Sequence, residues 1–371
     1  MKTILVIFGG QSVEHDISVI TALQAMESVN GYEILPLYIK TDGTMVTADN
    51  LPDGNIYLNY KKLVKNERQV FFSPGRNEIF LLKKNKIKGF IKPYCALLCN
   101  HGHGGEDGCL QGLLEMCNIP YSSSSVLSSA ITMDKVLTKM VLEKNHILTP
   151  AYVHFNKYEY MHTKEEILSK INDKLSLPCI IKPANGGSSV GIGICENEDM
   201  LNRAILEALE FDEKILVEKF VENAKEFSCA VIKSGNKLFA SRIWQVKKGK
   251  FFTFEEKYLR GAEKVQDEVP KKLEEKIKVV AKDCYQSLEC GGVVRVDFLY
   301  DESAKKLYVG EINSIPGSLA FNLFPYPFPD LIACLVEEGV IKSQEKRGIK
   351  YAFSSSAIKK YLELGKLRSK K

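Results

Sequence analysis

Two strand-like segments near the end of the chain constrain its fold more than any other feature. Residues 292–300 and 306–313 alternate apolar with polar side chains, and the polar residues 301–304 between them have the length of a hairpin turn. We therefore expect two adjacent antiparallel strands. Because side chains alternate between the two faces of a strand, Arg295 and Asp297 should share one face while the apolar residues take the other.

Oxygen-bearing side chains are expected to converge on that face. Glu311 and Asn313 share a face of the second strand, and a turn centred near Ser303 places Asp297 almost opposite Glu311. Two carboxylates and an amide oxygen suit Mg²⁺ or Mn²⁺, whose charge would offset the repulsion between the acids. For these residues taken alone, an ion pair between Arg295 and one of the carboxylates on an exposed sheet face remains an open alternative.

The N-terminal part of the chain alternates strand and helix signals. Residues 3–8 form a continuous apolar run, typical of a buried parallel strand, and Gly9-Gly10 leads into a helix expected to reach Val29. Further strands are expected at 32–39 and 95–98. This pattern predicts a small doubly wound parallel sheet, with the polar and basic stretch 42–92 as an inserted loop region.

Two glycine-rich loops lie at the ends of strands in this predicted sheet. One is Gly9-Gly10, with Glu14 close behind it; the other is His101–Gly108, which opens a helix. Ligands bind at such carboxyl ends, and helix N-termini favour anions. For His101 we favour hydrogen bonding behind a ligand over zinc binding, because no complete set of zinc ligands is nearby in sequence.

From about residue 149 onward the pattern is mixed α+β. Strands are expected at 179–182, 191–195, 215–220, 227–232, 239–245, 292–300 and 306–313. Residues 270–289 have apolar side chains at helical spacing, and Glu274 and Lys278 form a supporting pair.

The loop after Lys182 is a candidate phosphate site. Residues 185–191 read Asn-Gly-Gly-Ser-Ser-Val-Gly, and glycines and hydroxyl groups between two strands can surround a phosphate with backbone N–H groups. The loop lacks the P-loop pattern, and a plain hairpin turn is the alternative.

Composition excludes several classes of protein. No apolar run approaches the roughly 18 residues of a membrane span, and the N-terminus has no signal-peptide pattern. The ten scattered cysteines form no CxxC pair, which favours reduced thiols and a cytoplasmic protein. Residues 61–92 and 342–371 each carry ten Lys or Arg against two Glu. Neither tract matches a nucleic-acid-binding motif, so we expect solvated surfaces, with no nucleic acid and no membrane as partner.

A larger set of motifs, in order from about residue 4 to 325, resembles the D-alanine–D-alanine ligases, a family of ATP-grasp carboxylate–amine ligases. The matching segments are Phe8–Ser18, His101–Gly108, Gln111-Gly112, Leu114-Glu115, Ile119–Tyr121, Met133–Lys135, Ile181–Pro183, Gly187–Gly191, Glu218-Lys219, Glu256–Tyr258, Arg295–Phe298, Glu311–Asn313 and Pro316-Gly317. Any one of these motifs is weak, whereas the ordered set is specific.

The resemblance implies an α/β and α+β fold, with an N-terminal doubly wound parallel-sheet domain followed by an ATP-grasp fold of two β-rich subdomains. The expected segments are 1–128 (N-terminal substrate-binding domain), 129–222 (small ATP-grasp subdomain), 223–345 (C-terminal subdomain with the metal site) and 346–371 (basic extension).

The resemblance also implies how ATP would bind. The adenine would lie near Glu218, Lys219, Phe220 and Val221, with Glu226 toward the ribose. Lys135, Lys182 and Lys257 would hold the phosphates. Asp297, Glu311 and Asn313 would hold two Mg²⁺ (or Mn²⁺) ions.

For the reaction, the resemblance implies that one D-alanine becomes an acyl phosphate and the amine of a second D-alanine displaces the phosphate. Glu14 would bind the ammonium group of the first D-alanine, with His101 and Glu106 in support. Ser188 and Tyr258 would join Glu14 to close a loop over the site. Arg295 and the backbone N–H of Gly317 would stabilise the oxyanion.

One departure from the family concerns the second substrate. Asn322 stands where the family often has a serine, next to Leu323, and this pair would contact the second carboxylate. D-Serine or another small second substrate is therefore the alternative to D-alanine. The resemblance further implies a homodimer.

Overall fold

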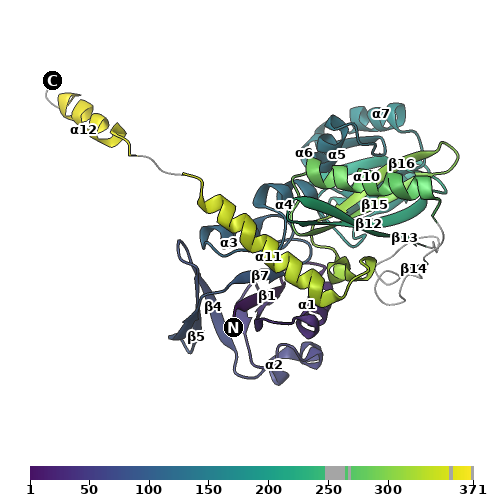
Figure 1. Cartoon of the computed structure of the whole chain (residues 1–371). Coiled ribbons are helices and arrows are strands. Elements are labelled where there is room, and N and C mark those ends of the chain that lie inside the picture. The colour runs from purple at the N-terminus through teal and green to yellow at the C-terminus, as the bar shows by residue number, and fades with distance from the viewer. Residues whose placement is uncertain (247–263, 266–268, 351–353, 369–371) are drawn as a thin grey trace.

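The computed structural model describes residues 1–246, 264–265, 269–350 and 354–368. Three sheets organise these residues. Figure 1 shows the N-terminal sheet below and the two other sheets above it. The long helix α11 (Phe328–Arg347) runs between the two parts.

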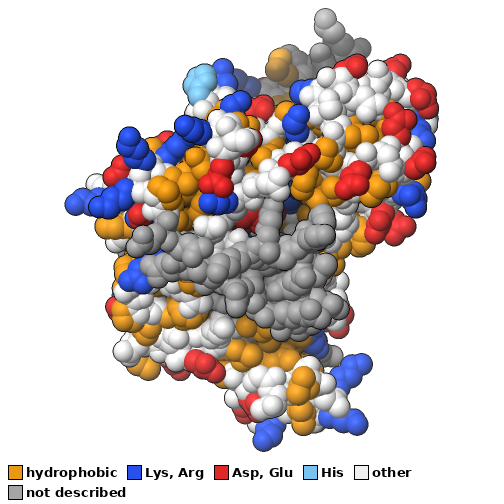
Figure 2. Space-filling model, turned by 90° about the vertical axis from the view of Figure 1, so that its right-hand side faces the viewer, with side chains coloured by type: hydrophobic (Ala, Val, Ile, Leu, Met, Phe, Trp, Pro, Cys, Tyr) orange, Lys and Arg blue, Asp and Glu red, His pale blue; other side chains and the backbone are white. Residues whose placement is uncertain are grey.

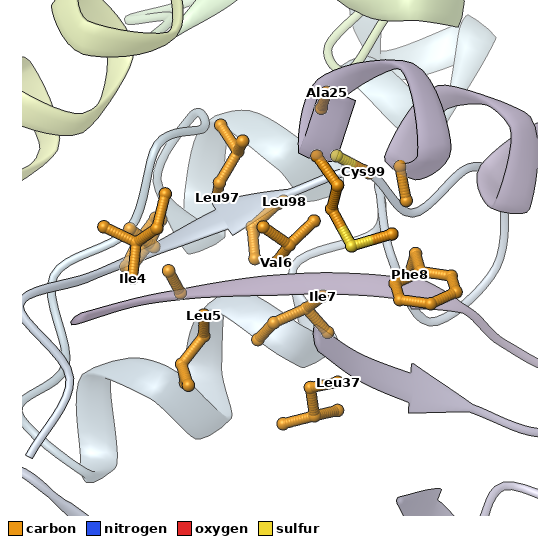
Figure 3. Close-up of a cluster of buried hydrophobic side chains, with 14 of the residues drawn as sticks. Ile4, Leu5, Val6, Ile7, Phe8, Ala25, Leu37, Leu97, Leu98 and Cys99 are labelled. Atoms are coloured by element: carbon orange, nitrogen blue, oxygen red, sulfur yellow. The ribbon is translucent and has the colours of Figure 1, made fainter. Parts of the chain in front are cut away.

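The N-terminal sheet is built around a buried parallel strand. β1 (Thr3–Gly9) pairs in parallel with β2 (Glu33–Ile39) on one side and β7 (Cys95–Leu98) on the other. Ile4 to Phe8 are all fully buried, because α1 (His15–Ser28) and other helices cover the sheet. Figure 3 shows these side chains pointing alternately to the two faces of β1 and meeting Leu37, Leu97 and Leu98. The expected parallel strands are confirmed.

The interpretation of 42–92 as an inserted loop region is wrong. Four strands in this stretch extend the same sheet as antiparallel neighbours, in the order β6-β5-β4-β3-β2-β1-β7. They are β3 (Met45–Thr47), β4 (Arg68–Ser73), β5 (Glu78–Lys83) and β6 (Lys86–Ile91), preceded or interrupted by the short helices η1 (Gly54–Leu58) and α2 (Tyr60–Leu63). Only one face of these strands is buried, as Val70, Ile79 and Leu81 show. The other face includes the exposed side chains of Phe71 and Phe90. Lysines in α2, at the end of β5 and in β6 make the stretch look polar in sequence.

The second sheet belongs to the smaller of the two upper parts. Its order is β10-β9-β11-β8, all antiparallel. Its strands are β8 (Tyr152–Asn156), β9 (Cys179–Pro183), β10 (Gly193–Cys195) and β11 (Lys214–Lys219), covered by α6 (Lys157–His162), α7 (Lys164–Lys174) and α8 (Glu198–Ala208). The sequence reasoning missed β8.

The third sheet contains the predicted hairpin. Its order is β14-β13-β12-β15-β16, and α10 (Lys271–Ser287) packs on one face through Ile277, Ala281 and Cys284. The strands are β12 (Lys225–Ser234), β13 (Lys237–Val246), β14 (Lys264–Val265), β15 (Val293–Asp301) and β16 (Lys306–Asn313). The expected pair on α10 forms, with Lys278 Nζ donating to Glu274 at 2.6 Å.

Helices connect the three sheets. α3 (Cys109–Met116), α4 (Val126–Met133) and α5 (Lys135–Lys144) lead from the N-terminal sheet to the second sheet. α11 (Phe328–Arg347) returns to the N-terminal sheet, where Leu331, Leu335 and Val336 are part of the same core as β1. The expected segment boundaries remain predictions, and this packing shows that α11 lies with the first segment in space.

The C-terminal helix α12 (Ala357–Arg368) extends away from the body in Figure 1. Residues 354–364 are exposed. On the face shown in Figure 2, acidic and basic side chains are interspersed over the upper part, with more basic ones at the left and more acidic ones at the right. Within the ranges that the structure describes, none of the helices has the length and apolar character to cross a membrane.

Candidate active site

The hairpin brings its polar side chains together as the sequence predicts. β15 and β16 are antiparallel, with Asp297 opposite Glu311 and Arg295 opposite Asn313. Asn313 Nδ2 donates to Asp297 Oδ2 at 2.9 Å. Ser228, on the neighbouring β12, donates its hydroxyl to Asp297 Oδ1 at 2.7 Å. The three expected oxygen-bearing side chains therefore lie on one face of the sheet.

Arg295 makes the ion pair that the sequence left as an alternative. Its Nε and Nη2 atoms donate to Asp297 at 2.9 and 2.8 Å. The side chains of Asp297 and Glu311 are 28% and 36% exposed, so both remain accessible to a ligand. The ion pair and the oxygen cluster therefore share Asp297, which accepts from Arg295 with both carboxylate oxygens and from Asn313 with one of them.

The donor set fits a hard divalent cation. Two carboxylates and an amide oxygen on adjacent strands are the ligands that Mg²⁺ accepts, together with phosphate oxygens and water. In the described ranges, no three His, Cys, Asp or Glu side chains group closely enough to hold a metal. The expected site differs from such a group because its third donor is the amide of Asn313.

Lys135 connects this cluster to the glycine-rich loop 185–191. It is the first residue of α5, whose N-terminus is capped by Asp134 through bonds of 2.9 and 3.0 Å from the next backbone N–H groups. Lys135 Nζ lies 3.5 Å from Glu311 Oε1 and also donates to the backbone oxygen of Gly186. The lysine is therefore aimed at the space between the hairpin and the loop.

Lys182 forms part of a buried charge cluster on the second sheet. It pairs with Glu218 on the adjacent strand β11, two register positions away, where both side chains point to the same face of the sheet. Lys139 pairs with the other oxygen of Glu218 at 2.7 Å. Burial raises the pKa of Glu218, but the two lysines outweigh it and hold that pKa at about 2. Burial lowers the pKa of Lys182, but Glu218 outweighs it, so both groups are charged at neutral pH.

Lys139 was not found by the sequence reasoning. A signal was present, because Lys139 follows Lys135 by four residues and so lies on the same face of a helix. What the spacing could not indicate is its partner Glu218, which is 79 positions further along the chain.

The segment expected to bind adenine joins the second sheet to the third. Lys219 ends β11 and is exposed, while Phe220 and Val221 are half-buried in the connection. Glu226 lies at the start of β12, and its charge acts on Lys182. These residues therefore lie at the junction between the two sheets.

Glu14 lies between the loops 101–108 and 185–191. It is 8% exposed and accepts a hydrogen bond from the Ser188 hydroxyl. A Cβ atom at Gly187 would lie 2.5 Å from Glu14 Oε2, and one at Gly102 would lie 2.8 Å from it. Only glycine leaves room for this carboxylate at both positions. The structure thus brings Glu14 and Ser188 together from distant parts of the sequence.

Glu106 links the loop 101–108 to the segment after β16. Its carboxylate accepts hydrogen bonds from the backbone N–H groups of Gly102 at 2.8 Å and Ile315 at 2.9 Å. Burial and the nearby Glu14 carboxylate raise the pKa of Glu106 to about 8. The first-substrate side therefore contains two neighbouring acids.

His101 helps to hold the segment that follows β16. Burial lowers its pKa to about 4, so the imidazole is neutral at pH 7. Its Nε2 lies 2.9 Å from the hydroxyl of Thr21, which also accepts a hydrogen bond from the backbone N–H of Ser318 at 3.0 Å. This contact holds the start of η2 (Gly317–Leu323). The space next to Gly317 is open, because a Cβ atom at that position would meet no other atom within 4 Å.

Asn322 and Leu323 differ in their exposure. Asn322 is exposed on η2, whereas Leu323 is only 3% exposed and lies in the N-terminal core. A ligand could therefore contact Leu323 only through its backbone. The remaining expected residues, Lys257 and Tyr258, lie outside the described residues.

Two antiparallel sheets joined at a lysine- and carboxylate-lined junction define the ATP-grasp class of architecture. Solved structures of this class superpose on the chain. A D-alanine-D-alanine ligase from Coxiella burnetii has a TM-score of 0.78 at 24% identity, covering 100% of this chain and 99% of the other. The VanG D-Ala:D-Ser ligase from Enterococcus faecalis has a TM-score of 0.78 at 28% identity, covering 91% and 99%.

Sequence comparisons specify the family. A family model described as D-ala D-ala ligase N-terminus matches residues 3–124, and one described as D-ala D-ala ligase C-terminus matches 141–331. A D-alanine–D-alanine ligase from Thermosipho melanesiensis is 37% identical over 94% of this chain and 96% of its own length. One from Caldicellulosiruptor bescii is 34% identical over 94% and 98%. The chain belongs to the D-alanine–D-alanine ligase family.

Proposed function

We propose that this protein joins two D-alanines to D-alanyl-D-alanine with hydrolysis of ATP, for the synthesis of a peptidoglycan precursor. The observation that carries the proposal is the convergence of two sites. The cation-lined junction of Lys135 and Lys182 borders the oxygen cluster of the hairpin, and Glu106 connects this region to Glu14.

On the nucleotide side, Lys135 and Lys182 bind phosphate oxygens, and residues 218–221 with Glu226 bind the adenosine. The buried side chain of Glu218 is paired with two lysines, so this residue contributes through its backbone. Asp297, Glu311 and Asn313 would hold Mg²⁺ or Mn²⁺, which supplies charge neutralisation for the transferred phosphoryl group. Positioning and charge account for most of the catalysis in such a transfer. We assign Lys257 to the same task.

On the amino-acid side, the Glu14 carboxylate binds the ammonium of the first D-alanine. The first carboxylate attacks the γ-phosphate, the bond to the β-phosphate breaks and ADP leaves, which gives an acyl phosphate. The amine of the second D-alanine then attacks the acyl carbon, and inorganic phosphate and the amine's proton are released. Arg295 and the Gly317 N–H stabilise the tetrahedral oxyanion. The contact between Ser188 and Glu14 holds the loop 185–191 closed, which excludes water that would hydrolyse the acyl phosphate; we assign Tyr258 to the same closure.

The second candidate is a ligase that takes D-serine as its second substrate. Two observations favour its inclusion: Asn322 is exposed where the family often has serine, and the VanG D-Ala:D-Ser ligase shares this fold at 28% identity. Asn322 can donate a hydrogen bond to either substrate's carboxylate. We also propose a homodimer, located in the cytoplasm where ATP is available.

The test is mass-spectrometric identification of products from ATP, Mg²⁺ and a panel of D-amino acids. We expect D-alanyl-D-alanine and D-alanine-dependent release of ADP. D-Alanyl-D-serine as the main product from an equal mixture would favour the second candidate. Absence of ADP release with every D-amino acid would contradict both.

A further inference from the structure

Lys139 is a buried lysine that the proposed reaction does not use. Its side chain is 4% exposed, and its Nζ lies 2.7 Å from Glu218 Oε1 and donates to the backbone oxygen of Pro150 at 3.2 Å. A buried ammonium group is costly unless it is paired. Burial lowers the pKa of Lys139, although the Glu218 carboxylate opposes the shift. A position this unfavourable for a lysine indicates a specific need for its charge.

The need follows from the charges around Glu218. Glu218 is 2% exposed and pairs with Lys139 through one oxygen and with Lys182 through the other. These three groups by themselves carry a net charge of +1. The charges of Glu226 and Glu311 also act on Lys182, and that of Glu143 acts on Lys139. Without Lys139, Glu218 would neutralise Lys182 completely. A phosphate would then have to compete with a buried carboxylate for the lysine that binds it.

We propose that Lys139 is a positioning residue that neutralises Glu218 and thereby makes the charge of Lys182 available to the nucleotide phosphates. This inference rests on the proposed function, since it assumes that Lys182 binds ATP. It adds that the affinity for ATP depends on a residue that does not itself touch the nucleotide. A residue with a merely structural role would change stability without a specific loss of nucleotide affinity.

The test is calorimetric binding of ADP with Mg²⁺ to purified full-length variants. K139M should bind ADP about tenfold or more weakly, the effect of losing one charge-assisted contact. K139R should bind like the wild type. The matched control is K144M, which removes an exposed lysine from the same helix. In kinetic assays K139M should raise the KM for ATP. The KM for D-alanine should stay within about twofold of the wild-type value, which is less than the loss of one charge-assisted contact would cause.

The double variant K139M/E218Q gives the sharpest result. With Glu218 removed, no carboxylate is left for Lys139 to neutralise, so the ADP affinity of the double variant should stay within about twofold of that of E218Q alone. If K139M does not fold, this comparison of E218Q with K139M/E218Q decides by itself. Unchanged ADP affinity in K139M, or a tenfold loss between E218Q and the double variant, would overturn the inference. Failure of the wild type to form any dipeptide would instead overturn the proposed function.

Discussion

The pKa values of two buried carboxyl groups in this site are shifted in opposite directions. The pKa of Glu218, on the nucleotide side, is held at about 2, whereas that of Glu106, on the amino-acid side, is raised to about 8. Burial raises the pKa of both groups. The difference comes from their neighbours, because Glu218 lies between two lysines and Glu106 lies next to Glu14.

This contrast fits the substrates that we propose for each side. A cluster with excess positive charge attracts phosphates, and a pair of acids attracts an ammonium group. If the two sides are separate electrostatic units, a substitution on one side should change the affinity for one substrate and leave the other unchanged.

The largest effect is expected where the two sides meet, at the hairpin. Asp297→Asn removes a proposed metal ligand and the partner of Arg295. We expect turnover to fall about a thousandfold, the scale of losing a preorganised charge at the reacting centre. The measurement is the steady-state rate of ADP release. Thermal unfolding serves as the control, and turnover within tenfold of the wild type would remove Asp297 from the proposed mechanism.

Glu14→Gln should separate the two sides. It removes the charge that binds the ammonium group and weakens the contact with Ser188. We expect the KM for the first D-alanine to rise about tenfold to a hundredfold, as for a lost charge-assisted hydrogen bond. ADP affinity, measured by calorimetry, should not change. Equal losses of both affinities would show that the sides are not separate units.

Glu106→Gln should change how stability depends on pH. Because the folded pKa is raised to about 8, folded Glu106 holds a proton between about pH 4.5 and 8 while the unfolded chain releases it. The contribution of Glu106 to the free energy of unfolding is therefore fully present below the pKa that this carboxyl group has in the unfolded chain. It is lost as the pH rises toward 8, by up to about 1.4 kcal/mol per pH unit.

Gln has no proton to lose, so the variant should show a flatter melting profile between pH 5 and 8. The two oxygens of Glu106 accept from two backbone N–H groups, whereas the NH₂ group of a glutamine cannot accept. One N–H group therefore loses its partner in the variant, which lowers the free energy of unfolding by about 1–3 kcal/mol at every pH. The slope of melting temperature against pH is therefore the informative measurement. Parallel profiles for the two proteins would show that Glu106 is ionised throughout.

The smallest effect is expected from removing residues 354–371. α12 is exposed and extends away from both sides of the site. We expect kcat, the KM values and ADP affinity to remain within about twofold of the full chain, which is below the effect of a single lost hydrogen bond. A larger change in ADP affinity alone would connect the basic extension to the nucleotide side.

Sequence reasoning succeeded best at the hairpin and at β1. The register of Asp297 against Glu311 followed from alternation and a short turn, which are local properties. The parallel strand β1 followed from a continuous apolar run. The antiparallel strands within 42–92 were missed because lysines in α2, at the end of β5 and in β6 make the stretch look polar.

The sequence by itself determined the family, the mixed α/β and α+β fold and the identity of the polar groups, because ordered motifs and side-chain alternation are written along the chain. The tertiary structure alone decided how these groups are charged. Glu14 contacts Ser188, and Lys139 contacts Glu218, across long separations in sequence. The pKa of a buried carboxylate depends on which charges the fold brings within a few ångströms of it, and a linear sequence contains no such distances.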